Sequence, residues 1–321
     1  MLRYFIRRLL WACVLFVAVT LVTFVIFFVI PADPARQVCG QRATAECIQR
    51  ARHFLGLDQP MFVQYGRFLD RLVVQQSLGR SFTNRQDVTQ EVLRAAPVTA
   101  SLVFGGAVLW LLVAIPIGIL SALRPRSLLD RVTMVGVLIG ISATPVWTGL
   151  LAAYFFGYKL HVFPITGYCD FFSPTGDCGG PVQWAYHLVL PWCTFAVLFA
   201  ATYTRMIRAY TMETLNEDYV RTARAKGATE ARVLRSHVIR NAMLPVVTIL
   251  GMDIGLALGG AFFTETVYGL PGLGKLAVGA IGNFDLPTMQ GVVVFATLCI
   301  IVFNLVVDTL YAWIDPRIRL T

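Results

Sequence analysis

Residues 95–123 read AAPVTASLVFGGAVLWLLVAIPIGILSAL and contain no Asp, Glu, Lys or Arg. A helix that crosses the ~30 Å hydrocarbon core of a bilayer needs roughly 20 apolar residues, because it rises ~1.5 Å per residue. This run is long enough, so it predicts a membrane-spanning helix. Further apolar runs predict spans at residues 9–30, 132–158, 178–204, 241–264 and 286–314. We therefore expect an all-α integral membrane protein with six transmembrane helices.

The composition of the whole chain agrees with this fold class. Of its 321 residues, 57% are hydrophobic and 14% are charged, whereas soluble domains carry about 25% charged residues. A disordered chain, an ordinary cytosolic enzyme or a nucleic-acid-binding module would need far more charged surface. The formal net charge of +9 is therefore not taken as a sign of nucleic-acid binding, and the positions of the charges along the chain are considered instead. We expect a single transmembrane domain, residues 1–321, and no nucleic-acid partner.

The distribution of basic residues orients the predicted helices. Arg3, Arg7 and Arg8 precede the first run, and basic flanks stay in the cytoplasm. Six crossings place residues 124–131, residues 205–240 and the C-terminal tail on that same side, where they carry three, eight and two Lys or Arg. The two shorter outer connections carry one Lys each. Both termini are therefore predicted to be cytoplasmic.

Residues 31–94 form a predicted large extracytoplasmic segment after the first helix. This segment holds nine arginines, but segments of more than about 60 residues cross the membrane largely regardless of charge. A cleaved signal peptide is the competing interpretation of residues 1–30. The apolar run in those residues is longer than a signal core of about 7–15 residues, and no small-x-small cleavage site follows it. We therefore expect a retained first helix.

Four cysteines lie in the predicted outer connections: Cys39, Cys47, Cys169 and Cys178. That side of the membrane is oxidising and favours disulfides. Local pairs, Cys39 with Cys47 and Cys169 with Cys178, would each close a short loop, although four cysteines allow three connectivities. No Cys and His spacing in the chain is typical of a zinc site, so we expect no metal.

Asp253 lies near the middle of the fifth predicted span. An acid inside a membrane is costly and by default marks a functional interior. Asp253 is therefore a candidate to face a polar pathway between the helices, and a hydrogen bond between two packed helices is the alternative. No convergent acid–base or metal set accompanies it, so we expect no catalytic residues and no membrane-embedded enzyme.

The most informative connection is the loop of residues 209–240, which contains EDYVRTARAKGATE at residues 217–230. Two acids open a stretch of helix formers, where the helix dipole favours negative charge. Gly227 suits the positive φ that ends a helix, and Thr229 suits the N-cap of a second helix. The pattern predicts a helix, a Gly turn and another helix. A DNA-binding helix-turn-helix is disfavoured because membrane helices lie on both sides, while a basic loop that contacts anionic lipid stays an alternative.

This loop resembles the ATPase-docking loop of ABC importer permeases, in the form found in dipeptide and oligopeptide permeases. In that family an Ala-containing helix followed by Gly fits a groove on a cytoplasmic ATPase. The chain departs from the general family pattern at Arg221-Thr222, where Glu-Ala is usual, and at Arg240, where many relatives have Pro. The resemblance implies that nine residues couple this chain to an ATPase: Glu217, Asp218, Tyr219, Arg221, Ala223, Arg224, Lys226, Gly227 and Thr229.

Further motifs extend the resemblance over almost the whole chain. They include PADPA at residues 31–35, LGLDQP at 55–60, SLGRS at 77–81 and TETVYGLPGLG at 264–274. The last motif nearly matches a phosphate-binding P-loop, but Leu276 stands where Ser or Thr would ligate magnesium. We expect a tight turn before a short helix there, and ATP hydrolysis on other chains.

The resemblance implies the membrane subunit of an ATP-driven importer for di- or oligopeptides in a bacterial cell membrane. Its implied partners are a second homologous permease, two cytoplasmic ATPase subunits or domains, an extracytoplasmic solute-binding protein and the lipid bilayer. It implies no cofactor. Two alternatives stay open. One is the same architecture importing nickel chelates, glutathione or another small solute. The other is a secondary transporter without an ATPase, which internal repeats would favour.

Overall fold

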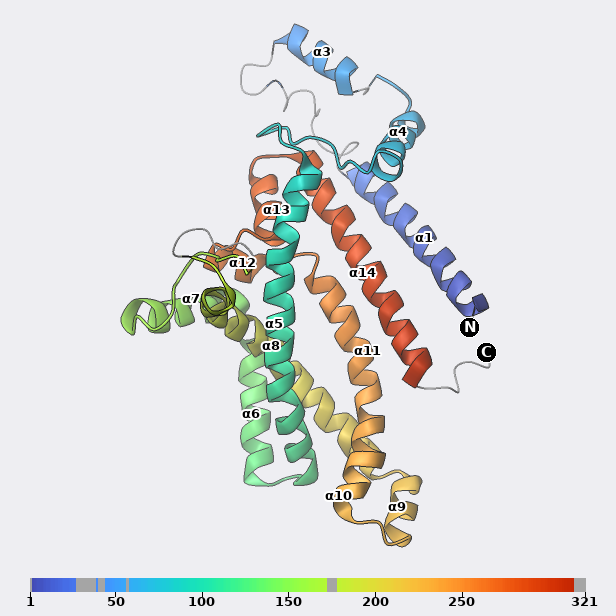
Figure 1. Ribbon diagram of the computed structural model, residues 1–321, viewed down its shortest axis with the longest axis vertical. Coiled ribbons are helices and arrows are strands. Elements are labelled where there is room, and N and C mark those ends of the chain that lie inside the picture. The colour runs from blue at the N-terminus through green and yellow to red at the C-terminus, as the bar shows by residue number, and fades with distance from the viewer. Residues whose placement is uncertain (1, 27–38, 40–43, 56–57, 172–177, 315–321) are drawn as a thin grey trace. The chain divides into compact units, whose positions relative to one another are not determined.

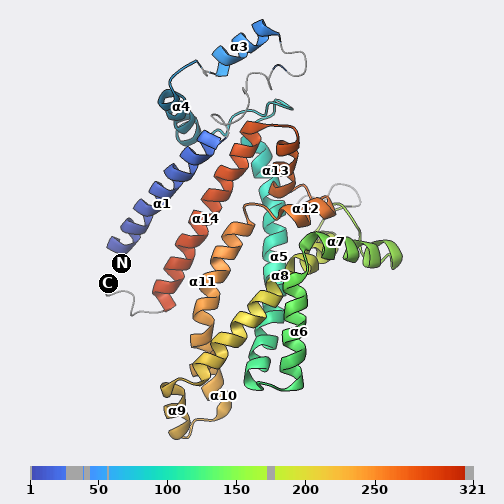
Figure 2. The same ribbon diagram turned by 180° about the vertical axis from the view of Figure 1, so that it is seen from behind.

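The computed structural model describes residues 2–26, 39, 44–55, 58–171 and 178–314. In this part of the chain every regular element is a helix, which confirms the predicted all-α class (Figures 1 and 2). The elements are α1 (Leu2–Phe24), α3 (Ala45–Leu55), α4 (Met61–Val73), α5 (Val88–Leu123), α6 (Leu128–Ser142), α7 (Pro145–Ala152), the π-helix η3 (Ala153–Lys159), α8 (Pro181–Leu215), α9 (Asp218–Ala225), α10 (Glu230–Val233), the π-helix η4 (Leu234–Ile239), α11 (Arg240–Ala257), α12 (Phe262–Tyr268), α13 (Leu273–Gly282) and α14 (Leu286–Ile314).

Five stretches of helix are long and apolar enough to cross a membrane. They are Ile6–Phe24, Val88–Leu123, Pro181–Leu215, Glu230–Ala257 and Leu286–Val307. A sixth is formed only if α6 and the α7–η3 helix, which are bent by 100° at a short break, count as one span. The number of six crossings and their orientation therefore stay predictions.

The bend divides residues 132–158, the apolar run for which the sequence predicts one span. Ala143 and Thr144 have extended backbones, with ψ of 111° and 144°. Thr144 precedes Pro145, and the proline ring disfavours the α region for the residue before it. Pro145 then occupies the first turn of α7. A backbone N–H at this position has no partner within the helix, so the missing N–H of proline costs nothing there. A single Pro in the apolar run thus changes the direction of the chain.

The described residues fall into two compact units. The first comprises Met1–Thr99, Gly255–Phe262 and Pro271–Leu305. Its core joins α5, α13 and α14 through buried apolar side chains, among them Val88, Leu273 and Val292. The predicted turn before a short helix is confirmed by the start of α13, where the Leu273 amide donates to Thr99 Oγ1 at 2.8 Å. This unit holds the described part of the predicted outer segment.

A buried acid fastens the end of that outer segment within the first unit. Asp285 precedes α14 and is buried. Its carboxylate accepts hydrogen bonds from Ser81 Oγ, from the Phe82 amide at 3.0 Å and from Thr288 Oγ1 at 2.9 Å. In the same unit α4 contacts α1, because the hydroxyl groups of Tyr65 and Thr20 share a hydrogen bond of 3.0 Å.

The second unit comprises Ala100–Ile254, Phe263–Leu270 and Val306–Thr321. In it α8 is packed closely by α5 and α6. A Cβ on Gly118 of α5 would lie 2.9 Å from the Ile207 side chain, and a Cβ on Gly140 of α6 would lie 2.7 Å from Ala201. Glycine at these positions lets the helix backbones approach, as is common between membrane helices. Trp110 of α5 is buried against the same helix.

Candidate functional site

The nine coupling residues predicted from the sequence lie on α9 and on the positions that flank it, between the end of α8 and the start of α10 (Figure 1). We call residues 217–230 the α9–α10 loop. Glu217 is the N-cap of α9, and Asp218 lies in its first turn. Gly227 follows α9 with a φ of 80°. Glycine adopts this left-handed conformation without the steric cost that a Cβ would add. The predicted helix, Gly turn and helix are confirmed.

The turn after α9 has the two hydrogen bonds of a Schellman motif. The Ala228 amide donates to the Ala223 carbonyl at 3.2 Å, and the Gly227 amide donates to the Arg224 carbonyl at 2.9 Å. These bonds satisfy carbonyls that the helix end would otherwise leave unpaired. Thr229 occupies the N-cap position of α10 as predicted, but its side chain makes no capping hydrogen bond. The turn between α9 and α10 is therefore held by hydrogen bonds of the backbone.

A small apolar cluster fixes α9 against the following helix. Val220 of α9, Val233 of α10 and Val238 of η4 are fully buried, and we call them the valine cluster. Leu215 at the end of α8 packs against this cluster, as does Ala223. Sequence analysis did not single out these valines. The spacing of Val220 and Ala223 could have indicated the buried side of α9, because residues three apart share a helix face.

The valine cluster leaves the polar side of the loop open. Eight of the nine predicted residues are exposed, and only Ala223 is half-buried. The guanidinium of Arg224 pairs with the carboxylate of Glu230 through two contacts, of 2.9 and 3.2 Å. Tyr219 accepts a hydrogen bond from the Asn241 side chain at 2.9 Å. The result is a polar surface on a braced helix that carries charges of both signs, three acids and three bases within residues 217–230, which suits recognition by a partner surface of complementary charge pattern.

Asp253 makes the helix–helix contact that the sequence left as an alternative. The Tyr203 hydroxyl of α8 donates to Asp253 Oδ2 of α11 at 2.7 Å. Tyr203 is buried, whereas Asp253 is only half-buried. The carboxylate thus keeps acceptor capacity beyond this one bond. The hydrogen bond ties two apolar helices together and leaves a pathway role for Asp253 as a prediction.

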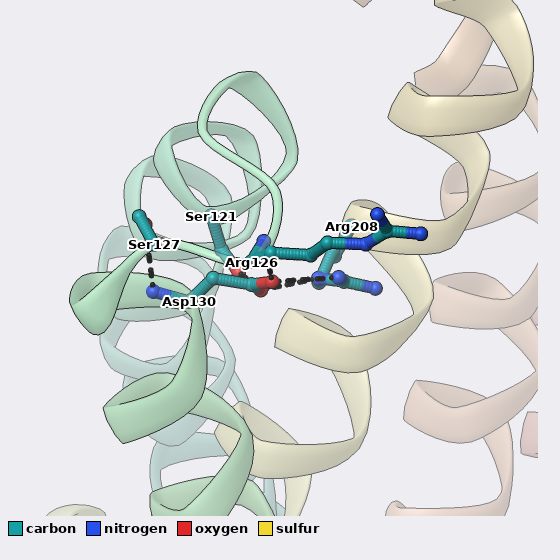
Figure 3. A network of polar contacts seen from close by, with 5 residues as sticks. All are labelled: Ser121, Arg126, Ser127, Asp130 and Arg208. Carbon is teal, nitrogen blue, oxygen red and sulfur yellow. Dashed lines mark hydrogen bonds and ion pairs between the residues drawn. The ribbon is translucent and has the colours of Figure 1, made fainter.

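Asp130, a buried acid at the start of α6, was missed by the sequence analysis (Figure 3). Its carboxylate receives Arg208 of α8 through contacts of 2.6 and 2.9 Å, one to each oxygen. Ser121 Oγ donates to it at 2.5 Å, and the Arg126 amide donates at 2.9 Å. The Asp130 amide in turn donates to Ser127 Oγ at 3.2 Å. The Ser-x-x-Asp spacing at residues 127–130 was the available signal, because it is typical of a capped helix start.

The four cysteines of the predicted outer connections are paired as the local hypothesis has them. Cys39 and Cys47 form one disulfide, and Cys169 and Cys178 form another. The His187 ring lies beside Cys169 Sγ at 3.4 Å. Within the described residues, these two sulfurs and His187 are the one group with a spacing that could hold a metal. Because the sulfurs are bonded to each other, they are not thiolate ligands.

Two family models match this chain. The description "Binding-protein-dependent transport system inner membrane component" covers residues 114–320, and the N-terminal model of the same kind of component covers residues 1–103. Together they account for nearly the full length of the chain.

Curated relatives align end to end. A probable D,D-dipeptide transport system permease protein of Escherichia coli (strain K12) is 38% identical over 98% of this chain and 96% of its own length. A putative peptide transport system permease protein of Brucella abortus (strain 2308) is 36% identical over 98% of both. A di/tripeptide transport system permease protein of Pseudomonas aeruginosa (strain UCBPP-PA14) is 37% identical over 99% of both.

The fold also resembles a solved structure, the inward-facing MetNI methionine ABC transporter. The match has a TM-score of 0.54 at 16% identity and covers 70% of this chain and 97% of the other. At this identity the likeness shows the fold alone. With the family models and the relatives, it identifies a multi-pass protein of the bacterial inner membrane that is not an enzyme. This chain belongs to the family of binding-protein-dependent ABC importer permeases, in its peptide-permease branch.

Proposed function

We propose that this permease imports di- and oligopeptides and that its α9–α10 loop docks on a cytoplasmic ATPase. The observation that carries the docking is the construction of the loop. A Schellman turn and the valine cluster brace α9 from within, while the predicted coupling residues other than Ala223 are exposed. A surface that is already rigid loses little conformational entropy on binding, so it can pass on force as well as bind.

The complete importer in this proposal has four kinds of component. This chain and a second homologous permease form the translocation path at their interface, and Asp253 faces that path. Two ATPase subunits grip the α9–α10 loops from the cytoplasm. A solute-binding protein delivers peptide to the outer face, where residues 31–94 form part of the docking surface. The relatives whose names describe dipeptide, di/tripeptide and peptide permeases support a peptide as the solute.

Reconstitution tests the solute. The permease is purified with its co-purifying chains and placed in proteoliposomes, and uptake of a labelled peptide is followed with and without ATP. We expect uptake that requires ATP and that unlabelled di- and oligopeptides compete away. Competition by nickel chelates or glutathione, with peptides ineffective, would replace the peptide with one of those solutes. Uptake without any ATPase would indicate a secondary transporter.

A matched pair of glycines tests the docking surface. Gly227 and Gly180 both have positive φ, of 80° and 86°, and nothing lies within 4 Å of the position that a Cβ would take at either. Aspartate therefore strains the backbone at both sites, and more so at Gly180, whose ψ of 165° lies in a region that is almost exclusive to glycine. We expect Gly227→Asp to reduce co-purification of the ATPase and ATP-dependent uptake, and Gly180→Asp, at the start of α8, to retain both. Equal retention in the two variants would refute the docking assignment.

Ala223 is a less selective test of the same surface. Its side chain packs against the valine cluster, so Ala223→Glu would also place a charge against buried apolar groups. A loss of uptake in that variant would report on the folding of the loop as well as on docking. Arg221→Glu is cleaner because the Arg221 side chain is exposed and lies 3.7 Å from Asp218 in a solvent-facing pair.

A further inference from the structure

The Asp130 network lies where three helices of the second unit meet. Ser121 is near the end of α5, Asp130 is in the first turn of α6, and Arg208 is on α8 (Figure 3). Asp130 accepts from all the polar groups described above and donates through its own amide to Ser127. One carboxylate therefore holds the α5–α6 turn at a fixed position along the axis of α8.

The part of α8 that contains Arg208 lies close in the chain to the α9–α10 loop. Arg208 lies about two helical turns before Leu215, the last residue of α8. Leu215 packs against the valine cluster, which also holds α9 and η4. A displacement of α9 is therefore passed to the end of α8 through packed side chains. Asp130 is the next point along α8 at which another helix is attached by directional bonds.

Directional bonds matter here because apolar packing alone resists sliding poorly between membrane helices. Lipid tails are as apolar as the helix surfaces, so no hydrophobic force holds two helices together, and close packing of small residues and polar contacts set their register instead. Close contacts such as Gly140 with Ala201 hold α6 and α8 near each other. The two-point contact of Arg208 with Asp130 additionally fixes their relative height, because a planar guanidinium binds a carboxylate in a defined orientation.

We propose that the Asp130–Arg208 pair is a positioning pair that makes the α5–α6 turn move with α8 when an ATPase moves the α9–α10 loop. This inference rests on the proposed docking function and adds to it the route inside the permease. Without the pair, the ATPase would still bind and move α9, but α5 and α6 would follow incompletely. ATP hydrolysis would then continue while solute transport fell.

The reconstituted complex tests this route through the amount of peptide transported per ATP hydrolysed. Asp130→Asn keeps one oxygen, which can accept from the Arg126 amide, and its NH2 group can donate to Ser121 Oγ, but it removes the ion pair. Arg208→Lys keeps the charge but loses the two-point geometry. We expect normal ATPase co-purification in both, and transport per ATP lowered about five-fold or more in Asp130→Asn, in the range of typical coupling between sites. The loss in Arg208→Lys should be smaller.

Arg126 provides the matched control within the same network. It reaches Asp130 through its backbone amide, and its side chain is exposed. Arg126→Ala thus removes a positive charge next to Asp130 without removing a contact to it. We expect unchanged transport per ATP. A ratio that is also unchanged in Asp130→Asn would overturn the proposal, as would loss of ATPase binding in Asp130→Asn, which would mean that the pair only shapes the loop.

A covalent tie separates a mechanical role from a local effect of charge. The double variant Asp130→Cys, Arg208→Cys is made in a chain whose free cysteines, Cys13, Cys193 and Cys299, are replaced by Ser. A short bis-thiol-reactive linker should restore transport per ATP in this variant, and failure to restore it with ATPase bound would count against the route. Absence of ATP-dependent uptake in the unmodified complex would instead refute the proposed function.

Discussion

The α9–α10 loop and the Asp130 network lie in the same unit, and both contain ion pairs, but they differ in exposure. In the loop, the Arg221 and Asp218 side chains are 69% and 97% exposed, and those of Arg224 and Glu230 are 40% and 74% exposed. In the network, the Arg208 and Asp130 side chains are 23% and 6% exposed. Exposed pairs exchange partners at little cost, whereas a buried charge that loses its partner is strongly destabilising. The loop is therefore suited to recognition and the network to transmission.

The largest expected effect comes from removing the buried acid. Asp130→Ala leaves the guanidinium of Arg208 without its partner. The loss of one member of a fully buried pair costs about 3–5 kcal/mol, and the cost here lies toward the lower end because the Arg208 side chain is 23% exposed. We expect a clear fall in the thermal unfolding midpoint of the detergent-solubilised protein. The midpoint of Asp130→Asn should fall less because asparagine keeps a hydrogen-bond acceptor. A midpoint within error of the unmodified protein would mean that Asp130 is solvated and would remove the contrast with the loop.

The valine cluster should show the next largest effect. Val220 is fully buried between α9 and the following helices. Val220→Ala removes two buried carbons and leaves a small cavity, which costs roughly 2 kcal/mol. We expect increased hydrogen exchange confined to residues 217–230, together with weaker ATPase binding. The exposed Ala225→Ser variant serves as the control on the same helix. Exchange that rises equally in α6 would show that the loop and the network are one cooperative element.

The exposed ion pair of the loop should contribute little to folding. Arg224→Gln removes its two contacts to Glu230, and pairs of this kind contribute about 0–1 kcal/mol. We expect almost no change in the unfolding midpoint, but weaker ATPase binding with a salt dependence lower than that of the unmodified protein. A loss of stability as large as that of Asp130→Ala would contradict the distinction between the two regions.

The smallest effect concerns the backbone that supports the network. Arg126 has a φ of 64°, a conformation that costs a residue with a Cβ about 1–2 kcal/mol. Arg126→Gly relieves this strain but gains freedom in the unfolded chain, so the two effects nearly cancel. We expect the free energy of unfolding, followed through the thermal midpoint, to be unchanged or raised by at most about 1 kcal/mol. A marked decrease would show that the Arg126 side chain also supports Asp130.

The features that the sequence predicted well are local ones. Gly227 and the acids that precede it predict the end and the start of α9 because capping involves residues within a few positions of one another. The break between α6 and α7 follows from Pro145, but the bend of 100° could not be predicted, since the length of an apolar run does not distinguish a straight helix from a bent one. The disulfides joined cysteines eight and nine residues apart, where short loops limit the choices.

What the sequence by itself determined is the class of the protein: apolar runs long enough to cross a bilayer, and a basic loop with the pattern of an ATPase-docking element. Only the tertiary structure decided which polar groups meet. Arg208 and Asp130 are 78 residues apart, and Tyr203 and Asp253 are 50 residues apart. Periodicity indicates which face of a helix is apolar but not which helix packs against it or at what height. Those choices depend on small residues such as Gly118 and Gly140, whose effect exists only when a second backbone comes close.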